Sequence, residues 1–390
     1  MTSKPPFDRQ SARMSDLLVA SFSGEWGKAE GPVLTPVLRT ANFNEDGTLD
    51  YANPAMRCIT DKKVQAKKMR RGDIILEKSG GTPNRSVGIL AYYDSDDLAL
   101  CSNFNQVLRF DECKVVPRYA FYQLRWLKGR NAFDRYTRKT TGLQNLEMKR
   151  FGELELLIPE PSTQHRIADT LDKILDTQRQ LDGQLTKLDS LVKSRFVEMF
   201  GDPVENPMGW PCEKLGDLGE LKNGVNFKAA DSGCEIKCLG VSDFKNRYSV
   251  SNMDLISTVT LNGEPTEKQM LRDGDVVFVR SNGNKQLVGR CLAVFPGDAR
   301  LTFSGFCIRF RNESDSLLLD YLLVCLKSDS MRKAMSGRGA NIQNLSQGLL
   351  SKVDVPLPPL ELQSEFADFT ARVDKLRFVF WSFLSVGAAR

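Results

Sequence analysis

Histidine is almost absent from this chain: His165 is the single one among 390 residues. One histidine argues against Cys-His zinc fingers, multi-histidine metal sites and most catalytic triads. The nine cysteines include no C-x-x-C pair, so neither a paired zinc ribbon nor a disulfide framework is indicated. We therefore expect no metal site, and we expect most cysteines to be small buried residues.

Long apolar runs are also lacking. No stretch of the sequence reaches the roughly 18 residues that a membrane-spanning helix needs. The first residues, MTSKPPFDRQSARM, lack the apolar region of a secretory signal. We therefore expect a cytoplasmic protein that has no membrane partner.

Signatures of nucleotide chemistry are missing too. The sequence contains no G-x-x-x-x-G-K-[ST] motif, and neither the Gly-Gly pair at 80–81 nor the Gly-Arg-Gly at 337–339 fits the dinucleotide fingerprint. The KPPF at 4–7 differs from the Asn-Pro-Pro-aromatic motif of amino-group methyltransferases, because lysine replaces the essential asparagine. We assign no catalytic residue and no cofactor to this chain.

The chain contains one series of sequence motifs twice. The same Gln-Asn-Leu turn, strand, proline pair and helix start occur in both halves, and other landmarks return at nearly the same offset. Because their order is preserved, we predict a duplicated domain of about 150 residues, each copy followed by a helix. The paired stretches are GLQNLEMKRFGELELLIPEPSTQHRIAD (142–169) with NIQNLSQGLLSKVDVPLPPLELQSEFAD (341–368), RRGDIILEKSGG (70–81) with LRDGDVVFVRSNG (271–283), and CSNF (101–104) with FSGF (303–306).

Each copy mixes strand and helix signals. Short β-rich runs that follow a glycine predict strands at Asp73–Leu76 and Asp275–Val279. Apolar residues at spacings of three and four predict helices over 118–136 and 317–335. Because strands and helices do not alternate regularly, we predict the α+β fold class.

A long helix is predicted from Gln164 to Phe200, where the sequence has no proline; at 1.5 Å per residue it would be about 55 Å long. Its apolar residues form a heptad seam, and a shorter, aromatic seam follows Gln363. We predict that the two helices pair in an antiparallel, coiled-coil-like manner, which relates the two copies by an approximate two-fold axis. Alternatively, the first helix lies on a globular core. The seam residues are Leu171, Ile174, Leu181, Leu185, Leu188 and Val192 in the first helix, and Phe366, Phe369, Val373 and Leu376 in the second.

Two loops in each copy are candidates for contact with nucleic acid. Lys and Arg outnumber Asp and Glu over 57–85 and 118–150, which is typical of a polyanion-binding face but also of a solvated surface. Arg and Lys neutralise phosphates or bind guanine, whereas Asn and Gln pair with adenine edges. The competing interpretation is an ordinary tight turn. The candidate DNA-binding residues are Lys78, Ser79, Thr82, Asn84, Arg85, Arg138, Lys139 and Thr140 in the first copy, and Arg280, Ser281, Asn282, Asn284, Lys285, Arg338 and Asn341 in the second.

Three phrases resemble a known family. LLIPEPSTQHRIADTLDKILDTQRQL, the RFVEMFGDP that ends its helix, and the Gly-Trp and Leu-Gly-Asp start of the second copy (209–217) are similar to the DNA-specificity subunit of type I restriction-modification systems. The resemblance implies two target recognition domains, 1–160 and 201–358, each reading one half of a bipartite site in double-stranded DNA. It also implies that the helices at 161–200 and 359–390 are conserved spacers.

The same resemblance implies protein partners. Two adenine-methyltransferase (modification) subunits would dock on the helices, and a restriction subunit with motor activity would join them. S-adenosylmethionine and ATP are expected in those partner subunits, whereas this chain would be non-catalytic and without a cofactor of its own.

Two departures from the family pattern affect these expectations. The helix that begins at Gln363 is shorter and less polar than the family usually shows, so docking of a second methyltransferase there stays open. The first copy lacks a Gly-Trp start, so we expect its first strand to be truncated. Two other functions also stay open, namely a coiled-coil scaffold for two protein-binding domains and a self-sufficient DNA methyltransferase. DNA binding by the assembled complex and methyl transfer by the isolated chain distinguish them.

Overall fold

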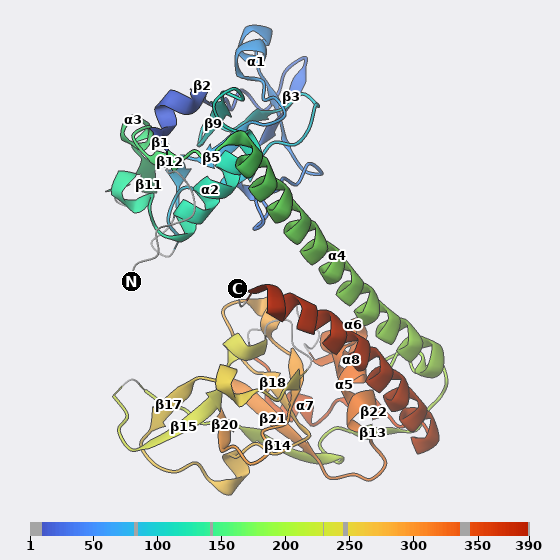
Figure 1. The fold of residues 1–390 in the computed structure, drawn as a ribbon. Helices are drawn as coiled ribbons and strands as arrows, with labels where there is room; N and C mark the ends of the chain where they lie inside the picture. The colour runs from blue at the N-terminus through green and yellow to red at the C-terminus, as the bar shows by residue number, and fades with distance from the viewer. Residues whose placement is uncertain are drawn as a thin grey trace. The chain divides into compact units, whose positions relative to one another are not determined.

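The computed structural model describes residues 10–81, 85–140, 143–228, 230–244, 249–335 and 344–388 (Figure 1). The chain divides into two compact units, with unit 1 comprising Met1–Gln180 and unit 2 comprising Leu181–Arg390. Both units contain sheets and helices, as the predicted α+β class requires.

Unit 1 has a four-stranded sheet of order β2-β9-β5-β7 that packs on a three-stranded sheet of order β4-β3-β8. Apolar side chains of both sheets, including Leu38, Ile75 and Val107, form the core between them. The elements of unit 1 are β1 (Ser11–Arg13), β2 (Leu18–Ser23), β3 (Leu34–Leu38), β4 (Ala55–Cys58), α1 (Asp61–Lys67), β5 (Ile74–Glu77), β6 (Ser79–Gly80), β7 (Leu90–Tyr92), β8 (Leu100–Cys101), β9 (Asn105–Phe110), α2 (Pro117–Gly129), β10 (Thr137–Thr140), β11 (Leu143–Leu146), α3 (Met148–Phe151) and β12 (Glu155–Leu157).

Unit 2 has a five-stranded sheet of order β14-β21-β18-β19-β16 and a three-stranded sheet of order β17-β15-β20. Its core between these sheets includes Leu239, Val277 and Phe303. The elements of unit 2 are β13 (Cys212–Lys214), β14 (Gly219–Asn223), β15 (Cys234–Leu239), β16 (Ser249–Val250), β17 (Thr258–Leu261), β18 (Asp275–Val279), β19 (Cys291–Val294), β20 (Leu301–Phe303), β21 (Cys307–Asn312), α5 (Leu319–Lys327), α6 (Asp329–Met335), α7 (Gln347–Leu350), β22 (Asp354–Pro356) and α8 (Leu360–Ala388).

The two units repeat one topology, which confirms the predicted duplication. In unit 1, β3 pairs antiparallel with β4 and parallel with β8. In unit 2, β15 pairs antiparallel with β17 and parallel with β20. The pairs β1 with β12 and β13 with β22 also correspond. Because β1 and β13 have three residues each, the expectation of a truncated first strand in the first copy was wrong.

In each copy, the aspartate of the repeated Gly-Asp pair is buried and forms an ion pair with an arginine. Asp275 is 1% exposed, and its two oxygens accept hydrogen bonds from Arg311 at 2.8 and 2.7 Å. Asp73 binds Arg109 in the same way, with both distances at 2.7 Å. Each arginine also donates to a backbone carbonyl. The pair therefore ties the turn before the central strand to the neighbouring strand of the sheet.

We expect Asp275→Ala to destabilise unit 2 by about 3 kcal/mol, because it leaves the partly buried Arg311 guanidinium without its buried carboxylate. Glu267→Ala is the matched control, since Glu267 pairs with Arg272 at an exposed position, where an ion pair contributes about 1 kcal/mol or less. Urea unfolding of the purified chain measures both values. Equal stability of the two variants would contradict the structural role of the pair.

The repeated proline-glutamine phrase fixes the start of each long helix. Gln164 is buried, donates to the carbonyl of Pro159 at 2.7 Å and accepts the N–H of Val116 at 2.8 Å. Gln363 donates to the carbonyl of Pro358 at 2.8 Å and accepts the N–H of Leu318 at 2.8 Å. Because residues 116 and 318 immediately precede α2 and α5, each glutamine joins the start of a long helix to the start of a domain helix.

Two helix predictions need correction. The helix predicted over 118–136 ends at Gly129, because Asn131 adopts a positive φ of 58° and the chain then enters β10. The helix predicted over 317–335 is divided into α5 and α6 at Ser328, whose backbone is extended. The Ser328 hydroxyl accepts the N–H of Met331 at 3.2 Å, which begins a new helix. Serine therefore acts here as a cap, which the apolar spacing does not reveal.

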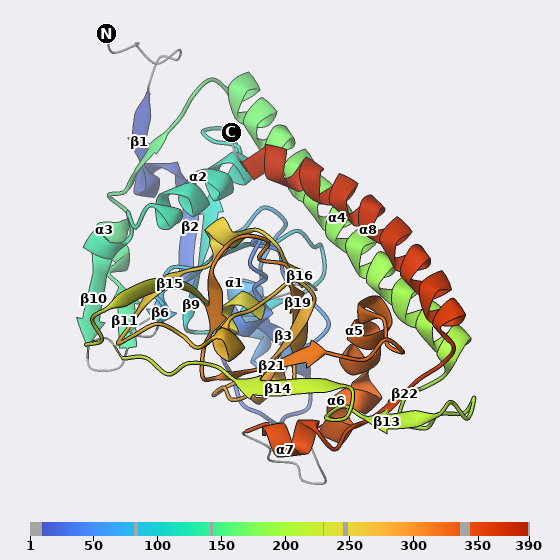
Figure 2. The same cartoon turned by 90° about the horizontal axis from the view of Figure 1, so that it is seen from below.

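The helix α4 (Pro161–Phe200) includes the whole of the predicted Gln164–Phe200 helix. Within unit 2, its C-terminal part runs antiparallel to α8 (Figures 1 and 2), because Asp189 pairs with Arg377 at 2.5 Å and Arg195 with Glu365 at 2.8 Å. This contact is aromatic. Phe196 lies 5.6 Å from Phe366 and 5.5 Å from Tyr321 of α5, measured between ring centroids. The second half of α4 is thus part of the unit 2 core.

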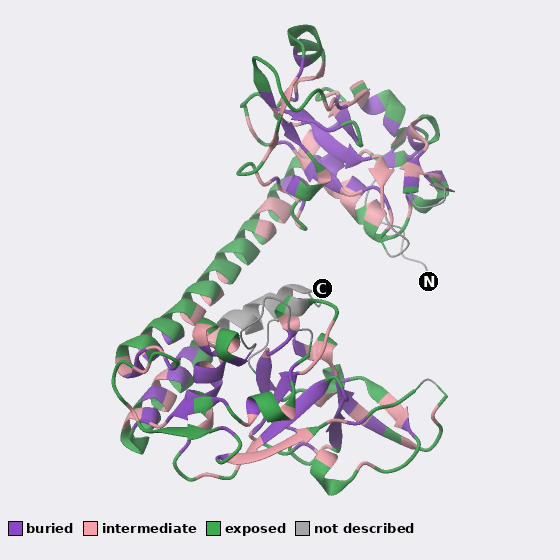
Figure 3. Ribbon diagram, turned by 180° about the vertical axis from the view of Figure 1, so that it is seen from behind, coloured by how far each residue is buried: buried purple, intermediate pink, exposed green. Residues whose placement is uncertain are grey.

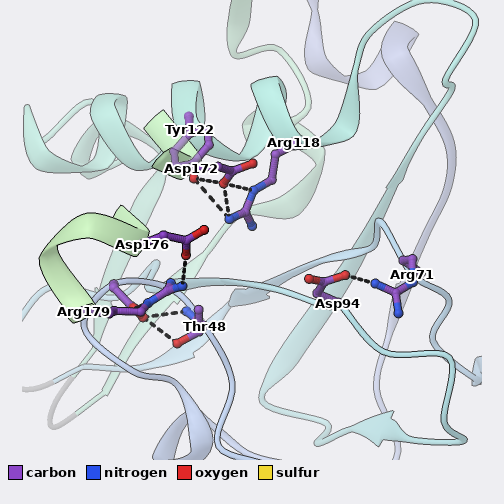
Figure 4. A network of polar contacts seen from close by, with 9 residues as sticks. Thr48, Arg71, Asp94, Arg118, Tyr122, Asp172, Asp176 and Arg179 are labelled. Atoms are coloured by element: carbon purple, nitrogen blue, oxygen red, sulfur yellow. Dashed lines mark hydrogen bonds and ion pairs between the residues drawn. The ribbon is translucent and has the colours of Figure 1, made fainter. Parts of the chain in front are cut away.

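Figure 4 shows the contacts that anchor the first part of α4 within unit 1. The Asp172 carboxylate accepts hydrogen bonds from Arg118 Nε at 2.7 Å and from the Tyr122 hydroxyl. Further along the helix, Arg179 Nε donates to Asp46 at 2.8 Å. These contacts join α4 to α2 and to the loop before β4.

The predicted seam is occupied unevenly, and Figure 3 shows that most of the middle of α4 is exposed. Ile174 and Leu376 are 49% and 51% exposed. The heptad count missed Phe196 and Phe200, which are buried, because a helix on a core uses a wider face than two heptad positions. Of the other predicted seam residues, Val192, Phe366 and Val373 are buried, and Leu171, Leu181, Leu185, Leu188 and Phe369 are half-buried.

Candidate nucleic-acid interface

In unit 1, the two candidate loops meet in one small sheet. β11 lies between β10 and β6. Ser79 pairs with Asn145, and its hydroxyl donates to the Asn145 side-chain oxygen at 2.5 Å. The N–H of Leu146 donates to the carbonyl of Lys78 at 2.8 Å. The segment after the Gly-Asp strand and the segment around the Gln-Asn-Leu turn therefore form one surface.

Unit 2 brings the equivalent segments together in the same way. Ser281 forms a β-bridge with Asn344, and the N–H of Leu345 donates to the carbonyl of Arg280 at 2.7 Å. The backbone match between the units is residue for residue, because residues 78 and 79 correspond to residues 280 and 281. In both units, the segment after the central strand is therefore hydrogen-bonded to the asparagine-leucine pair of the Gln-Asn-Leu turn, at Asn145–Leu146 and at Asn344–Leu345.

A phenylalanine carbonyl completes the arrangement in each unit. The carbonyl of Phe104 accepts the N–H groups of Lys78 and Ser79 at 3.0 and 3.1 Å, and that of Phe306 accepts those of Arg280 and Ser281 at 2.8 and 3.3 Å. We call this place the loop junction. It consists of Lys78, Ser79, Phe104 and Asn145 in unit 1, and of Arg280, Ser281, Phe306 and Asn344 in unit 2.

The basic side chain of each loop junction is held by neutral oxygens. Lys78 Nζ donates to the Ser23 hydroxyl at 2.7 Å, and burial lowers the pKa of Lys78. Arg280 Nη1 donates to the carbonyl of Gly305 at 3.4 Å. Within the described part of the chain, neither cation forms an ion pair with a carboxylate. Both can therefore interact with phosphate or with the acceptor edge of guanine.

Arg85 has a different environment from the one the sequence suggests. Its guanidinium donates to both oxygens of the buried Glu77 carboxylate, at 3.1 and 2.7 Å. A Cβ atom on Gly80 would lie 2.6 Å from the same carboxylate, and Gly80 has a φ of 140°, which explains the glycine at this position. The ion pair holds Arg85 against the end of β5, so a base contact by Arg85 stays a prediction.

In unit 2, Asn282 and Asn284 stabilise the turn of the candidate loop that follows β18. The side-chain oxygen of Asn282 accepts the N–H of Asn284 at 2.8 Å, and that of Asn284 accepts the N–H of Gln286 at 3.0 Å. Such local bonds are typical of asparagine in turns. Arg138 is exposed on β10, opposite Asn145. Outside the described residues lie Thr82, Asn84, Arg338 and Asn341, together with the side chains of Lys139, Thr140 and Lys285.

Phe104 and Phe306 were not among the predicted site residues. They lie at corresponding places in the repeated CSNF and FSGF stretches, so their recurrence was visible in the sequence. What the sequence could not show is that their carbonyls anchor the candidate loops.

A duplicated α+β domain, in which each copy has a polar, basic loop junction and is followed by a long helix, defines a class of tandem recognition proteins. The type I restriction modification DNA specificity domain matches this chain twice, at residues 34–188 and 207–378. The chain therefore belongs to that family, which confirms the resemblance drawn from its sequence.

Relatives and solved structures agree with this assignment. The chain is 24% identical to the type I restriction enzyme StySPI specificity subunit of Salmonella potsdam, over 90% of this chain and 82% of the relative. It is 21% identical to the putative type I restriction enzyme MjaX specificity subunit of Methanocaldococcus jannaschii, over 92% and 89%. The crystal structure of the S subunit of a type I restriction-modification system from M. genitalium has a similar fold, with a TM-score of 0.56 and 16% identity over 99% and 94% of the two chains.

None of the helices in the described part of the chain combines the length and the apolar character that crossing a membrane requires.

Proposed function

We propose that this chain is the non-catalytic DNA-recognition subunit of a type I restriction-modification complex, and that each unit reads one half of a bipartite site in double-stranded DNA. The recognition domains are 1–160 and 201–358, and the helices at 161–200 and 359–390 separate them. Family membership supports the proposal, as do the relatives that are named specificity subunits.

The loop junction is the observation that carries this proposal. Its backbone hydrogen bonds are the same in both units, whereas Lys78 is replaced by Arg280. The other junction residues, a serine, a phenylalanine and an asparagine, are the same in both units, so the junction is a shared framework. The loops that continue from it differ in sequence, with GGTPNRS at 80–86 and NGNKQ at 282–286. One framework with different loops suits two half-sites of different sequence.

We propose that the long helices act as a spacer and as a docking surface for two adenine-methyltransferase subunits, which a restriction subunit with motor activity then joins. Ile174 and Leu376 are exposed at heptad positions, where apolar residues pack against a partner helix, so each is a candidate contact for a docked subunit. S-adenosylmethionine and ATP are bound by the partners in this proposal, and the complex acts in the cytoplasm.

Binding by the assembled complex tests this function. The chain, combined with its methyltransferase, is expected to bind one duplex sequence selectively, and the logarithm of the affinity should fall by roughly 0.9 per neutralised phosphate for each tenfold increase in salt. The methyltransferase without this chain is the control and should bind without selectivity. Methyl transfer by the isolated chain, or a complex that binds all duplexes equally, would contradict the proposal.

The two basic junction residues are expected to act on separate half-sites. Lys78→Ala should change affinity or base preference in the first half-site only, and Arg280→Ala in the second only, because each cation lies on its own unit. A lost base contact weakens discrimination by about 1–3 kcal/mol. Competition binding with duplexes substituted in one half at a time measures this, and each variant is the control for the other. An equal loss for every sequence would instead make both residues phosphate contacts.

A further inference from the structure

Phe104 and Phe306 are large apolar residues that are exposed to solvent, with exposed fractions of 51% and 61%. Each is the third residue of a β-turn, between β8 and β9 in unit 1 and between β20 and β21 in unit 2. The turns are closed by the N–H of Asn105 donating to Ser102 at 3.0 Å and that of Cys307 donating to Ser304 at 2.8 Å. The duplication has therefore kept an exposed phenyl ring at the same point of both units.

Both phenylalanines are held firmly by their backbone. The carbonyl of each accepts two N–H groups from the segment that follows the central strand, as described for the loop junction. In unit 1, the preceding residue is bound as well, because the Ser23 hydroxyl donates to the carbonyl of Asn103 at 3.4 Å. A ring on a fixed turn can contact a partner with little loss of conformational entropy.

The residues that are hydrogen-bonded to the backbone of each phenylalanine, and those that pair with them, have side chains of the kinds that contact nucleic acid. The loop junction supplies one cation, one serine and one asparagine in each unit, namely Lys78, Ser79 and Asn145, or Arg280, Ser281 and Asn344. Cations and hydroxyls bind phosphates, whereas an apolar ring gains nothing from phosphate and most from the face of a base or from a thymine methyl group. An uncharged surface of a protein partner would offer no anion to the cation of the junction, so nucleic acid matches the two side chains better.

We propose that Phe104 and Phe306 are base-contacting residues, and that each ring makes an apolar contact with the bases of its own half-site. This inference rests on the proposed function and adds residues to it. The cation of each junction binds its own half-site through a phosphate or the acceptor edge of a guanine, and the ring contacts other bases of the same half-site. The ring either stacks on a base at an opened step or packs against a thymine methyl group.

The test uses the complete complex with methyltransferase and a duplex that carries the site mapped from methylated adenines. Phe104→Ala and Phe306→Ala are each expected to weaken binding to this duplex by about 5- to 150-fold, which is the range for loss of one base-aromatic contact. Binding to a random duplex should change little. Each variant should also become less sensitive to substitutions in its own half-site, and not in the other.

Matched controls separate a base contact from a general loss of aromatic surface. Trp126 in unit 1 and Phe295 in unit 2 are also exposed, and they lie outside the loop junctions. Their alanine variants should bind the mapped duplex as the unmodified complex does. Because Phe104 and Phe306 are exposed, their alanine variants should unfold at an unchanged temperature, which excludes misfolding as the cause of weak binding.

Further arms identify the kind of contact. If the ring packs on a thymine methyl group, Phe→Leu keeps most of the affinity, and replacing thymine with deoxyuracil removes the difference between Phe and Ala. If the ring stacks, Leu behaves as Ala does, and 2-aminopurine in the half-site reports unstacking only with Phe present.

Wild-type affinity in both alanine variants would overturn the inference while leaving the proposed function intact. A wild-type complex without any sequence preference would overturn the proposed function itself.

Discussion

Inserting four alanines after Gly183 in α4 is expected to change the spacing between the two half-sites and leave each half-site sequence unchanged. The insertion adds about 6 Å of helix, which corresponds to about two base pairs at 3.4 Å each. The site is suitable because a Cβ atom at Gly183 would meet no atom within 4 Å. It also lies between the Arg179 contact in unit 1 and the Asp189 contact in unit 2, so both anchored ends of α4 stay intact.

The expected result is loss of methylation at the original sites and methylation at sites with a longer spacer. Mapping of methylated adenines in cells that express the variant complex measures this change. Substitution of the exposed Thr186 and Lys187 by alanine, without added length, is the control and should keep the original spacing. An active insertion variant with unchanged spacing would show that α4 does not set the distance between half-sites.

Replacing both Ile174 and Leu376 by aspartate is expected to release the methyltransferase subunits. Because both side chains are exposed at heptad positions, an aspartate there should hardly change the stability of the free chain. A docked partner helix would bury that charge, so the affinity of docking should fall strongly. At a position where the partner buries it, each aspartate should weaken binding by on the order of 2 kcal/mol, or roughly 30-fold in affinity.

Calorimetric titration of the purified chain with methyltransferase measures the loss, and the unfolding temperature should stay the same. Gln180→Asp, at another exposed position of α4, is the control and should bind normally. If the double variant still binds methyltransferase with full affinity, the subunits dock elsewhere on this chain.

The sequence predicted those parts of the fold that depend on local pattern or on repetition. The strand at Asp275–Val279 was predicted at its exact bounds, because an apolar run after a Gly-Asp turn is unambiguous. The helix α4 was predicted because residues 164–200 contain no proline and only one glycine, Gly183. The division of the helix at Ser328 was not predicted, because the apolar spacing continues through this residue, whose hydroxyl caps the next helix.

Contacts between distant residues could not be predicted. Ser79 and Asn145 are far apart in the sequence, and nothing local indicates that β6 and β11 pair. The candidate loops were therefore treated as two surfaces, although those of unit 1 meet in one sheet. The role of Gln164 was hidden for the same reason, because its partner Val116 lies on another element. Repetition was the stronger guide, since the residues that recur in both copies include both glutamines and both phenylalanines of the loop junctions.

Mapping methylated adenines in the DNA of cells that express this chain with its methyltransferase tests the central claim most directly. If two units read two half-sites, every methylated adenine falls within a single motif that has two specified blocks and an unspecified spacer of fixed length. Exchanging the unit 1 loop at residues 78–86 for the unit 2 loop at residues 280–286 should then alter one block only. Methylation at one continuous motif, or at adenines without a shared motif, would contradict recognition by two separate units.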